Sequence, residues 1–265
     1  MTINNIHPEA KLGKNVIVES FTTIAKNVEI GDNCWIGPNV TIMDYVKIGN
    51  NCKIFPGAVI GAVPQDLKFS DEITYVEIGD NTTLREYVTV NRGTASSGKN
   101  VTKVGSNCLL MSYVHIAHDC RIGDNVIMSS FVGLAGEIDV DDFAIIGGSS
   151  GAHQFTRIGV HAMISGGSMF SKDVPPYVVA GRRPLAFGGV NLIGLRRRGF
   201  SNEKIQEISD IYKIIYTAGL NISDACKKVE ETFAATTERD IILTFIRNSK
   251  RGIIKSVSAG SEDEG

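Results

Sequence analysis

An aliphatic residue returns at every sixth position along most of the first 170 residues. The first run is unbroken from Leu12 to Ile60, and the period resumes at Ile78 and again from Val104 to Phe170. Neither the helical period of about 3.6 residues nor a strict alternation fits this pattern, whereas a six-residue period is typical of parallel β-helices. The pattern therefore predicts a mainly β chain, a left-handed parallel β-helix of hexapeptide repeats with the aliphatic ladder buried inside.

Two segments interrupt the period, since residues 62–75 and 92–103 carry polar residues and glycines in place of ladder residues. We expect both to be loops extruded from the coil, where a rigid scaffold often holds functional residues. The prolines of VPPYVVAGRRP end the period. The β-helical domain is therefore predicted to span residues 1–190.

Residues 191–255 are predicted to form a small C-terminal helical domain. Three helices are expected there, because Ser201, Ser223 and Thr237 each precede a helical pattern that begins with acidic residues. Residues 256–265 are small and acidic and lack apolar periodicity. That composition predicts a disordered acidic tail.

Three hexapeptides make one triangular turn of such a helix, so residues 18 apart should stack along one edge. His118, Gly136 and Gln154 have this spacing and the same place in their repeats. An imidazole can accept a proton near neutral pH, and the amide of a glycine can approach a developing oxyanion. The row therefore predicts a general base beside an oxyanion donor, with Asp119 as a carboxylate that orients or stabilises the imidazole.

Other histidines allow a different interpretation. His115 lies three residues before His118, and His153 stands beside Gln154, so a zinc site of the kind found in γ-type carbonic anhydrases is an alternative. No cluster of thiolate or carboxylate ligands supports that alternative, and we expect no metal. His161 is interpreted as structural.

Composition and charge narrow the class further. The net charge is −2, which gives no reason to expect nucleic acid as a partner, and no apolar run of about 18 residues predicts a membrane span. The chain opens without the pattern of a signal peptide, so we expect a cytoplasmic protein. The five cysteines form no CxxC pair and are interpreted as reduced thiols: Cys34, Cys52, Cys108, Cys120 and Cys226. The first four occupy the small inward position of the repeat and are expected to pack inside the coil.

Basic residues gather near the predicted domain junction. They suit phosphate groups or an acidic protein, although a solvated basic face has the same composition. The residues are Arg182, Arg183, Arg196, Arg197, Arg198 and Lys204.

Several segments together resemble one known family, the UDP-N-acetylglucosamine O-acyltransferases that begin lipid A synthesis in Gram-negative bacteria. The resemblance covers nearly the whole chain and rests on QDLK at 65–68, RGT at 92–94, HIAHDC at 115–120, DDFAIIGG at 141–148, HQF at 153–155, DVPPYV at 173–178 and RRGF at 197–200.

The resemblance implies a homotrimer of left-handed β-helices with active sites in grooves between subunits. It also implies the reaction: the 3-hydroxyl of UDP-N-acetylglucosamine attacks the thioester of an (R)-3-hydroxyacyl acyl carrier protein, without a covalent acyl-enzyme. No cofactor is expected beyond the phosphopantetheine that the acyl carrier protein itself carries.

Carried over by position, the resemblance makes His118 the general base, Asp119 its carboxylate partner and the Gly136 amide the oxyanion donor. Gly166 matches the position that sets acyl length, and a glycine there implies a long chain, although Ser168 and Met169 could shorten the groove. The matches to substrate-binding positions are Asp66, Lys68, His115, His153, Gln154, Asn191, Arg197 and Arg198.

Two positions depart from the family pattern. Glu137 stands where better-known members have histidine, and Ile193 replaces a glutamate, so nucleotide contacts there are expected to differ. Three alternatives for the function remain open at this point. They are the related N-acyltransferase, which has an additional N-terminal domain, an acetyl-CoA-dependent sugar-nucleotide acetyltransferase, and a noncatalytic β-helical scaffold that binds sugar nucleotides.

Overall fold

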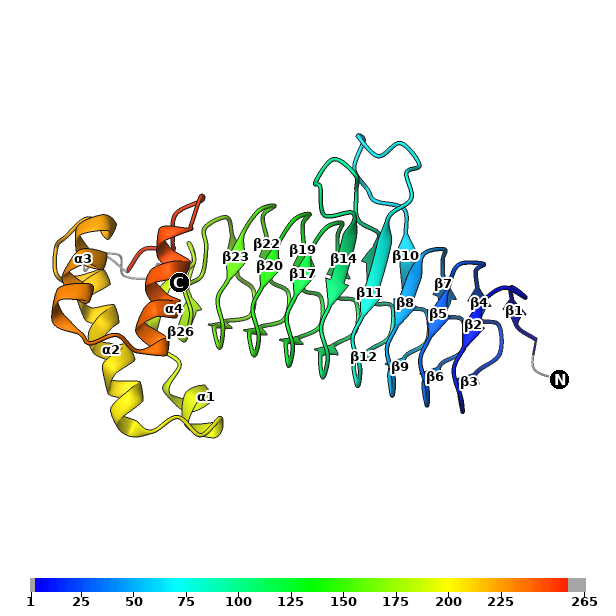
Figure 1. Ribbon diagram of the computed structural model, residues 1–265, viewed down its shortest axis with the longest axis horizontal. Coiled ribbons are helices and arrows are strands. Elements are labelled where there is room, and N and C mark those ends of the chain that lie inside the picture. Colours follow the sequence, from blue (N-terminus) through cyan, green and yellow to red (C-terminus); the bar gives the residue numbers. More distant parts are fainter. Residues whose placement is uncertain (1–2, 257–265) are drawn as a thin grey trace.

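In a computed structural model that describes residues 3–256, the chain forms a three-sided left-handed parallel β-helix capped at one end by helices (Figure 1). Most strands are two residues long, and the backbone turns a corner between consecutive strands. Each strand pairs with the strand one full coil further along the chain, so three flat parallel sheets run along the molecule. The fold predicted from the six-residue period is confirmed.

The three sheets, which we call A, B and C, are the faces of the prism. Sheet A contains β1 (Asn5–Ile6), β4 (Thr23–Ile24), β7 (Thr41–Ile42), β10 (Val59–Ala62), β13 (Thr89–Asn91), β16 (His115–Ile116), β19 (Gly133–Leu134), β22 (Gly151–Ala152) and β25 (Met169–Phe170). Sheet B contains β2 (Lys11–Leu12), β5 (Glu29–Ile30), β8 (Val46–Ile48), β11 (Tyr75–Ile78), β14 (Val101–Val104), β17 (Arg121–Ile122), β20 (Asp139–Val140) and β23 (Arg157–Ile158).

Sheet C contains β3 (Ile17–Val18), β6 (Trp35–Ile36), β9 (Lys53–Ile54), β12 (Thr83–Leu84), β15 (Leu109–Leu110), β18 (Ile127–Met128), β21 (Ile145–Ile146), β24 (Met163–Ile164), β26 (Val178–Gly181) and β27 (Ala186–Val190). The last two strands pair antiparallel, which ends the coil. We name the corners after the sheets that they join, as the AB, BC and CA edges.

The aliphatic ladder fills the prism. Ile36, Leu110 and Ile146 are fully buried, and each such side chain contributes roughly 1.5–3 kcal/mol by leaving water. The expected burial is wrong at the start of the ladder, where Leu12 is 38% exposed. Leu12 belongs to the first coils, which have few stacked neighbours to cover them.

The small inward position next to the ladder carries hydrogen-bond donors as well as aliphatic groups. The Thr82 hydroxyl donates to the Gly105 carbonyl at 2.7 Å, and the Cys34 thiol donates to the Gly49 carbonyl at 3.1 Å. All five cysteines are buried free thiols. The packing role that the repeat predicts for the first four agrees with this placement.

Corner residues explain why Asn and Asp crowd the repeats. The residue that turns most corners adopts a left-handed conformation, for example Asn33 at φ 58° and Asn51 at φ 56°. Asn and Asp tolerate this region better than other side chains that carry a Cβ. The tight corners keep the strands in register.

Two loops leave the coil at the AB edge and rise beside each other in Figure 1. The first runs over residues 63–74, between β10 and β11. The second runs over residues 92–100, because β14 begins at Val101 and pairs with β11 from Tyr75↔Val101 onward. The predicted loop ends at residues 62, 75 and 101–103 therefore belong to strands.

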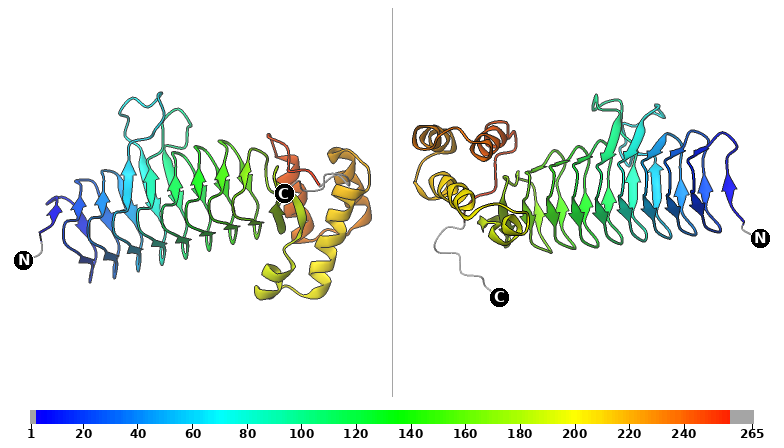
Figure 2. Two further views of the ribbon diagram at one scale, coloured as in Figure 1. Left: turned by 180° about the vertical axis from the view of Figure 1, so that it is seen from behind. Right: turned by 60° about the horizontal axis from the view of Figure 1, so that its bottom comes forward.

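The helices gather at the C-terminal end of the prism (Figure 2). There are four in the described part of the chain, α1 (Leu192–Arg197), α2 (Asn202–Thr217), α3 (Ile222–Thr232) and α4 (Thr237–Arg247). Tyr212 of α2 anchors them by donating its hydroxyl to the Pro176 carbonyl at 2.6 Å.

Three helix predictions need correction. The short α1 was not predicted, because its six residues contain Gly194 and show no helical period. Ser201 caps α2 as predicted, but Asn221 rather than Ser223 caps α3, and Thr236 rather than Thr237 caps α4. In each case an equally good capping side chain stands one or two positions earlier.

The predicted tail lies largely outside the described residues, which end at Ser256. That residue forms an isolated parallel bridge with Phe187. Within the described part of the chain, no helix is long and apolar enough to cross a membrane.

Candidate active site at the AB edge

His118 lies at the AB edge, in the turn between β16 and β17, and is 8% exposed. Its Nδ1 is 2.8 Å from Oδ2 of the buried Asp119. Its Nε2 is 3.9 Å from Oδ2 of Asp66 on the first loop. One nitrogen of the imidazole is therefore held by the buried carboxylate of Asp119. The other nitrogen faces the partly exposed carboxylate of Asp66.

Asp119 is positioned by both its backbone and its surroundings. It adopts the left-handed conformation of a corner residue, with φ 60°, and its N–H donates to Thr102 Oγ1 at 2.8 Å. Its carboxylate accepts hydrogen bonds from the backbone and side chain of Thr94 and from the hydroxyl of Ser97. Both oxygens of this buried carboxylate therefore have hydrogen-bond donors, as a buried polar group requires.

Gly136 lies directly over the imidazole. The coils stack in the expected register, with His115 paired to Gly133, and a Cβ built on Gly136 would be 2.4 Å from His118 Nε2. In the part of the chain that the structure describes, the Gly136 N–H has no hydrogen-bond acceptor. The stacked row expected from the 18-residue spacing is present, and only glycine fits above the histidine.

A hollow of about 570 Å³ lies on the outer face of sheet A beside this row. Its floor contains two glycines, Gly133 and Gly151, which pair across neighbouring strands. The exposed Met169 side chain lies over Gly151, with its sulfur 2.8 Å from where a Cβ would be. The lining is His115, Gly133, Leu134, Ala135, Gly151, Ala152, His153, Met169, Phe170 and Ser171.

His115 and His153 border this hollow in different environments. His115 Nδ1 is 2.7 Å from the Thr89 hydroxyl, and burial lowers the pKa of His115. His153 is exposed, with Nδ1 3.1 Å from the Gln154 carbonyl. His115 is thus a neutral, fixed ring, whereas the ring of His153 is accessible to a ligand.

Two other predicted site residues lie near this row. Gln154 is half-buried one coil above Gly136, and the exposed Lys68 lies on the first loop, two residues after Asp66.

The remaining predicted site residues lie elsewhere on the single chain. Asn191 caps α1 and donates to the His161 carbonyl at 3.0 Å, and Arg198 lies over the Phe143 ring at 4.3 Å. Phe143 and His161 belong to the BC edge. Arg197 is exposed at the end of α1. This group therefore does not meet the His118 dyad within one chain.

Gly166 lies at the third corner, the CA edge. A Cβ at Gly166 would be 3.1 Å from the Gly148 carbonyl oxygen, and Gly166 is outside the lining of the hollow on sheet A. In a single chain the hollow is bounded instead by Met169. The predicted residues thus divide among all three edges.

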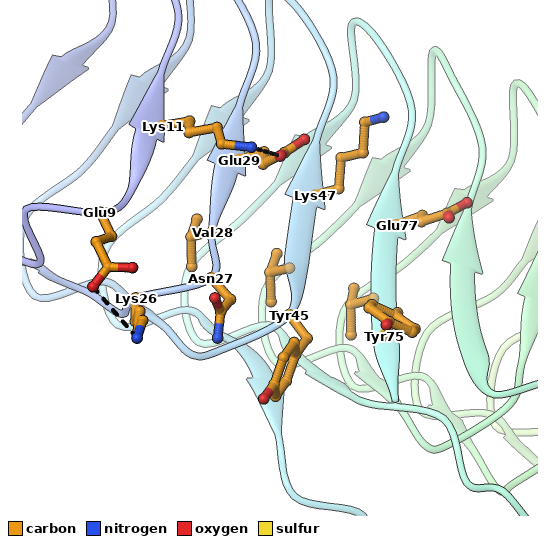
Figure 3. Close-up of a pocket in the computed structure, with 12 residues that line it drawn as sticks. Glu9, Lys11, Lys26, Asn27, Val28, Glu29, Tyr45, Lys47, Tyr75 and Glu77 are labelled. Carbon is orange, nitrogen blue, oxygen red and sulfur yellow. Dashed lines mark hydrogen bonds and ion pairs between the residues drawn. The ribbon is translucent and has the colours of Figure 1, made fainter. Parts of the chain in front are cut away.

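The chain has a second hollow away from this row. A hollow of about 400 Å³ on sheet B near the N-terminal end is lined by Tyr45, Tyr75 and paired charges such as Lys11 with Glu29 (Figure 3). Its nearest lining strand, β11, lies two coils from the strand that follows His118, and its lining contains no histidine. Within residues 3–256, no three His, Cys, Asp or Glu side chains are grouped as metal ligands would be.

Sequence reasoning missed Thr94, Ser97 and the glycine floor. Gly133 and Gly151 had a signal, because they stand 18 residues apart at an outward strand position that Thr89 and His115 occupy in the preceding coils. Thr94 and Ser97 had no local signal beyond their place in a loop, because the approach of that loop to Asp119 is a long-range contact.

Comparison with known proteins agrees with this geometry. Residues 27–62 and 102–136 match the family model described as bacterial transferase hexapeptide (six repeats), and residues 173–254 match domain 2 of Udp N-acetylglucosamine O-acyltransferase. The fold and the histidine row thus define a hexapeptide-repeat acyltransferase.

Whole-chain relatives define the family. The chain is 39% identical over 202 residues to an acyl-[acyl-carrier-protein]–UDP-N-acetylglucosamine O-acyltransferase of Burkholderia mallei (strain SAVP1), covering 75% of this chain and 77% of that one. The crystal structure of LpxA, a UDP-N-acetylglucosamine acyltransferase from Bacteroides fragilis 9343, matches with 54% identity and a TM-score of 0.93, covering 96% and 99% of the two chains. The Francisella novicida UDP-N-acetylglucosamine acyltransferase matches with 37% identity and a TM-score of 0.95, covering 100% and 96%. The chain belongs to the UDP-N-acetylglucosamine O-acyltransferase family, which confirms the resemblance seen in the sequence.

Proposed function

We propose that the protein transfers an (R)-3-hydroxyacyl chain from acyl carrier protein to the 3-hydroxyl of UDP-N-acetylglucosamine, the first step of lipid A biosynthesis. The names of its relatives support the donor and acceptor classes. The observation that carries the proposal is the His118 imidazole held by Asp119 directly beneath Gly136. That arrangement suits acyl transfer to a hydroxyl.

In the proposed reaction, His118 Nε2 takes the proton of the sugar 3-hydroxyl as its oxygen forms a bond to the thioester carbon. Asp119, hydrogen-bonded to Nδ1, stabilises the imidazolium that results. The carbonyl oxygen becomes an oxyanion and accepts a hydrogen bond from the Gly136 N–H. The intermediate then collapses, the carbon–sulfur bond breaks, and the thiolate of the carrier takes the proton back from His118.

The hollow on sheet A suits the acyl chain of the donor. It begins beside His115, and its floor of Gly133 and Gly151 gives an apolar chain room to lie against the sheet. Met169 closes it at the end away from His115. We therefore expect Met169 to limit acyl length together with Gly166, whose edge a neighbouring subunit would bring to the hollow.

We also propose a homotrimer with the active site shared between subunits. Within one chain, the dyad lies at the AB edge, while Asn191 and Arg198 contact His161 and Phe143 at the BC edge, between one and three coils further along, and Arg197 precedes Arg198. With strands about 4.8 Å apart, this offset is roughly 7–12 Å along the axis, in addition to the width of the prism face between the two edges. An adjacent copy offers the missing edge, so one site would contain both groups.

Arg197 and Arg198 would hold the diphosphate, since guanidinium groups bind phosphate oxygens with two hydrogen bonds. Ile193, which is 66% exposed on α1, cannot accept hydrogen bonds from a nucleotide as the glutamate of relatives could. Glu137 adds a carboxylate next to Gly136.

The proposed contacts to the sugar and the donor remain His153, Gln154, Asp66 and Lys68. No resident cofactor takes part, because the carrier brings its own phosphopantetheine.

A donor comparison tests the proposal. Purified protein is given UDP-N-acetylglucosamine with either (R)-3-hydroxyacyl carrier protein or acetyl-CoA, and the products are measured by mass. We expect rapid ester formation from the carrier thioester alone. Preference for acetyl-CoA would favour the acetyltransferase alternative, and binding without turnover would favour a scaffold. A parallel assay with an acylated UDP-glucosamine tests the N-acyltransferase, which would form an amide with that acceptor and no ester with UDP-N-acetylglucosamine.

A further inference from the structure

The second loop folds back onto the AB edge and surrounds a single residue of the proposed dyad. Thr94 donates its backbone N–H to both carboxylate oxygens of Asp119, at 2.9 and 3.1 Å. The hydroxyls of Thr94 and Ser97 donate to Oδ2 and Oδ1, each at 2.7 Å. Lys99 donates to the Asp119 carbonyl at 3.2 Å. Three residues of one nine-residue loop therefore converge on Asp119.

Gly93 allows the loop to come this close. A Cβ at Gly93 would be 2.3 Å from the Val101 nitrogen and 2.8 Å from Asp119 Oδ1. A larger residue would have to move the loop or the carboxylate. Thr94 itself is 1% exposed, so its hydroxyl has no competing water. The loop is thus packed against the carboxylate and is more than a tolerated insertion.

We infer that Thr94 is a positioning residue for the proposed reaction: it holds the Asp119 carboxylate in the orientation that binds His118 Nδ1. One oxygen, Oδ2, accepts both the His118 Nδ1 bond at 2.8 Å and the Thr94 hydroxyl bond at 2.7 Å. A carboxylate without these donors could rotate about its Cβ–Cγ bond and lose its alignment with the ring. The inference rests on the proposed function, because it gives Thr94 a role only if His118 acts as a base.

The same loop connects the dyad to the first loop, which carries Asp66. Glu72 of the first loop accepts hydrogen bonds from the backbone N–H groups of Ala95 and Ser70, at 3.1 and 2.7 Å. These backbone donors lower the pKa of Glu72 to about 2, so it is an anion at any working pH. Ala95 follows Thr94 directly, so the two loops and the carboxylate form one connected set of hydrogen bonds.

The experiment compares Thr94→Val with Thr94→Ser in the full-length protein. Valine keeps the shape of threonine but removes the hydroxyl, whereas serine keeps the hydroxyl. We expect Thr94→Val to lower kcat about tenfold, with KM for both substrates within about twofold of wild type. With the carboxylate out of alignment, Asp119 should stabilise the imidazolium less, so the acidic limb of kcat/KM should move to lower pH by on the order of half a unit. Thr94→Ser should restore both values.

Thr82→Val is the matched control. Thr82 is also a fully buried threonine, and its hydroxyl donates to the Gly105 carbonyl at 2.7 Å. It lies just before β12 of sheet C and makes no contact with Asp119. We expect this variant to lose thermal stability and to keep the wild-type pH profile. A threonine that acts through general packing alone would give the two valine variants the same profile.

Several results would overturn the inference. Wild-type kcat and pH profile in Thr94→Val would do so, and so would a raised KM with unchanged kcat, because the loop would then bind substrate. If Thr94→Val does not fold, Ser97→Ala decides: it should lower kcat and move the acidic limb in the same direction by less, and no change overturns the idea. Failure of the wild-type protein to transfer from acyl carrier protein would instead refute the proposed function.

Discussion

His118 and His161 lie at different corners of the same prism and have opposite surroundings. The His118 ring lies between two carboxylates, at 2.8 Å from Asp119 and 3.9 Å from Asp66. The His161 ring is stacked on Phe143 at 4.8 Å between centroids, and burial together with Arg198 lowers the pKa of His161 to about 4. Polar groups surround the first ring, whereas aromatic packing and burial keep the second ring neutral.

The difference comes from what covers each corner. At the AB edge, the first loop supplies the Asp66 carboxylate, and the second loop supplies the donors that hold Asp119. At the BC edge, Tyr177 and Phe200 pack around His161, at 5.8 and 5.2 Å between ring centroids. The same β-helical backbone thus holds a histidine in a polar site at one corner and a histidine among aromatic rings at another. The segments outside the repeat determine which surroundings a corner histidine has.

The largest expected effect comes from removing the ring of His118. His118→Ala should lower kcat by roughly 10²–10⁴-fold, the usual contribution of a general base. Binding of UDP-N-acetylglucosamine, measured by calorimetry, should remain, because the proposed phosphate contacts are on α1. Wild-type turnover in this variant would show that the two histidines do not differ in function.

Crowding the ring should have the next largest effect. Gly136→Ala would place a methyl group 2.4 Å from His118 Nε2 and displace either the ring or the amide. A displacement of about 1 Å in an active site costs on the order of 10²-fold in kcat. Gly133→Ala is the informative partner, because its Cβ would have no atom within 4 Å. It should keep kcat and narrow the range of acyl chains, and equal losses in kcat for both variants would contradict the assignment of Gly136.

A change in the hollow on sheet A should have a smaller effect, on the choice of acyl donor. Met169→Gly should remove the group that closes the hollow over Gly151. We expect kcat/KM for a donor a few carbons longer than the preferred one to rise about tenfold, relative to the preferred donor. Product masses from a mixture of 3-hydroxyacyl carrier proteins measure this ratio. An unchanged product distribution would place the limit on acyl length elsewhere, with Gly166 as the next candidate.

The packed ring should show the smallest effect, on stability alone. The folded pKa of His161, about 4, lies below the ordinary value of 6.5. Above pH 6.5 this difference adds nothing, but as the pH falls from 6.5 toward 4 the unfolded chain binds a proton that the folded chain does not, so stability is lost. His161→Phe removes this loss. The Tm of the variant minus the Tm of wild type should therefore be a few degrees larger at pH 4.5 than at pH 7. A Tm difference that does not depend on pH would contradict the neutral state of His161.

The sequence predicted the repeat-based part of the molecule well. A six-residue period states which side chains face inward and which residues stack, so the ladder through Ile116 and Leu134 and the row of His118, Gly136 and Gln154 could be placed without coordinates. The family resemblance added the roles proposed for these residues.

The parts outside the repeat were harder to predict, for physical reasons. The contact of Thr94 with Asp119 joins residues 25 apart through a loop whose path no local pattern specifies. The position of Arg198 against Phe143 depends on how the chain leaves the last coil, which tertiary packing decides. Helix α1 is too short to show a period, and its capping side chain, Asn191, also serves the His161 carbonyl.

The two loops show how this architecture tolerates change. Stacked partners are ordinarily 18 residues apart, but the separation is 30 across the first loop and 26 across the second, and the strands on either side still pair in register. Extra residues at a corner therefore leave the lattice intact, whereas a single deletion inside a coil would turn every later side chain toward the wrong face. The active-site residues of such a protein can accordingly change during evolution, through longer or exchanged loops at the corners, while the β-helix that carries the loops stays the same.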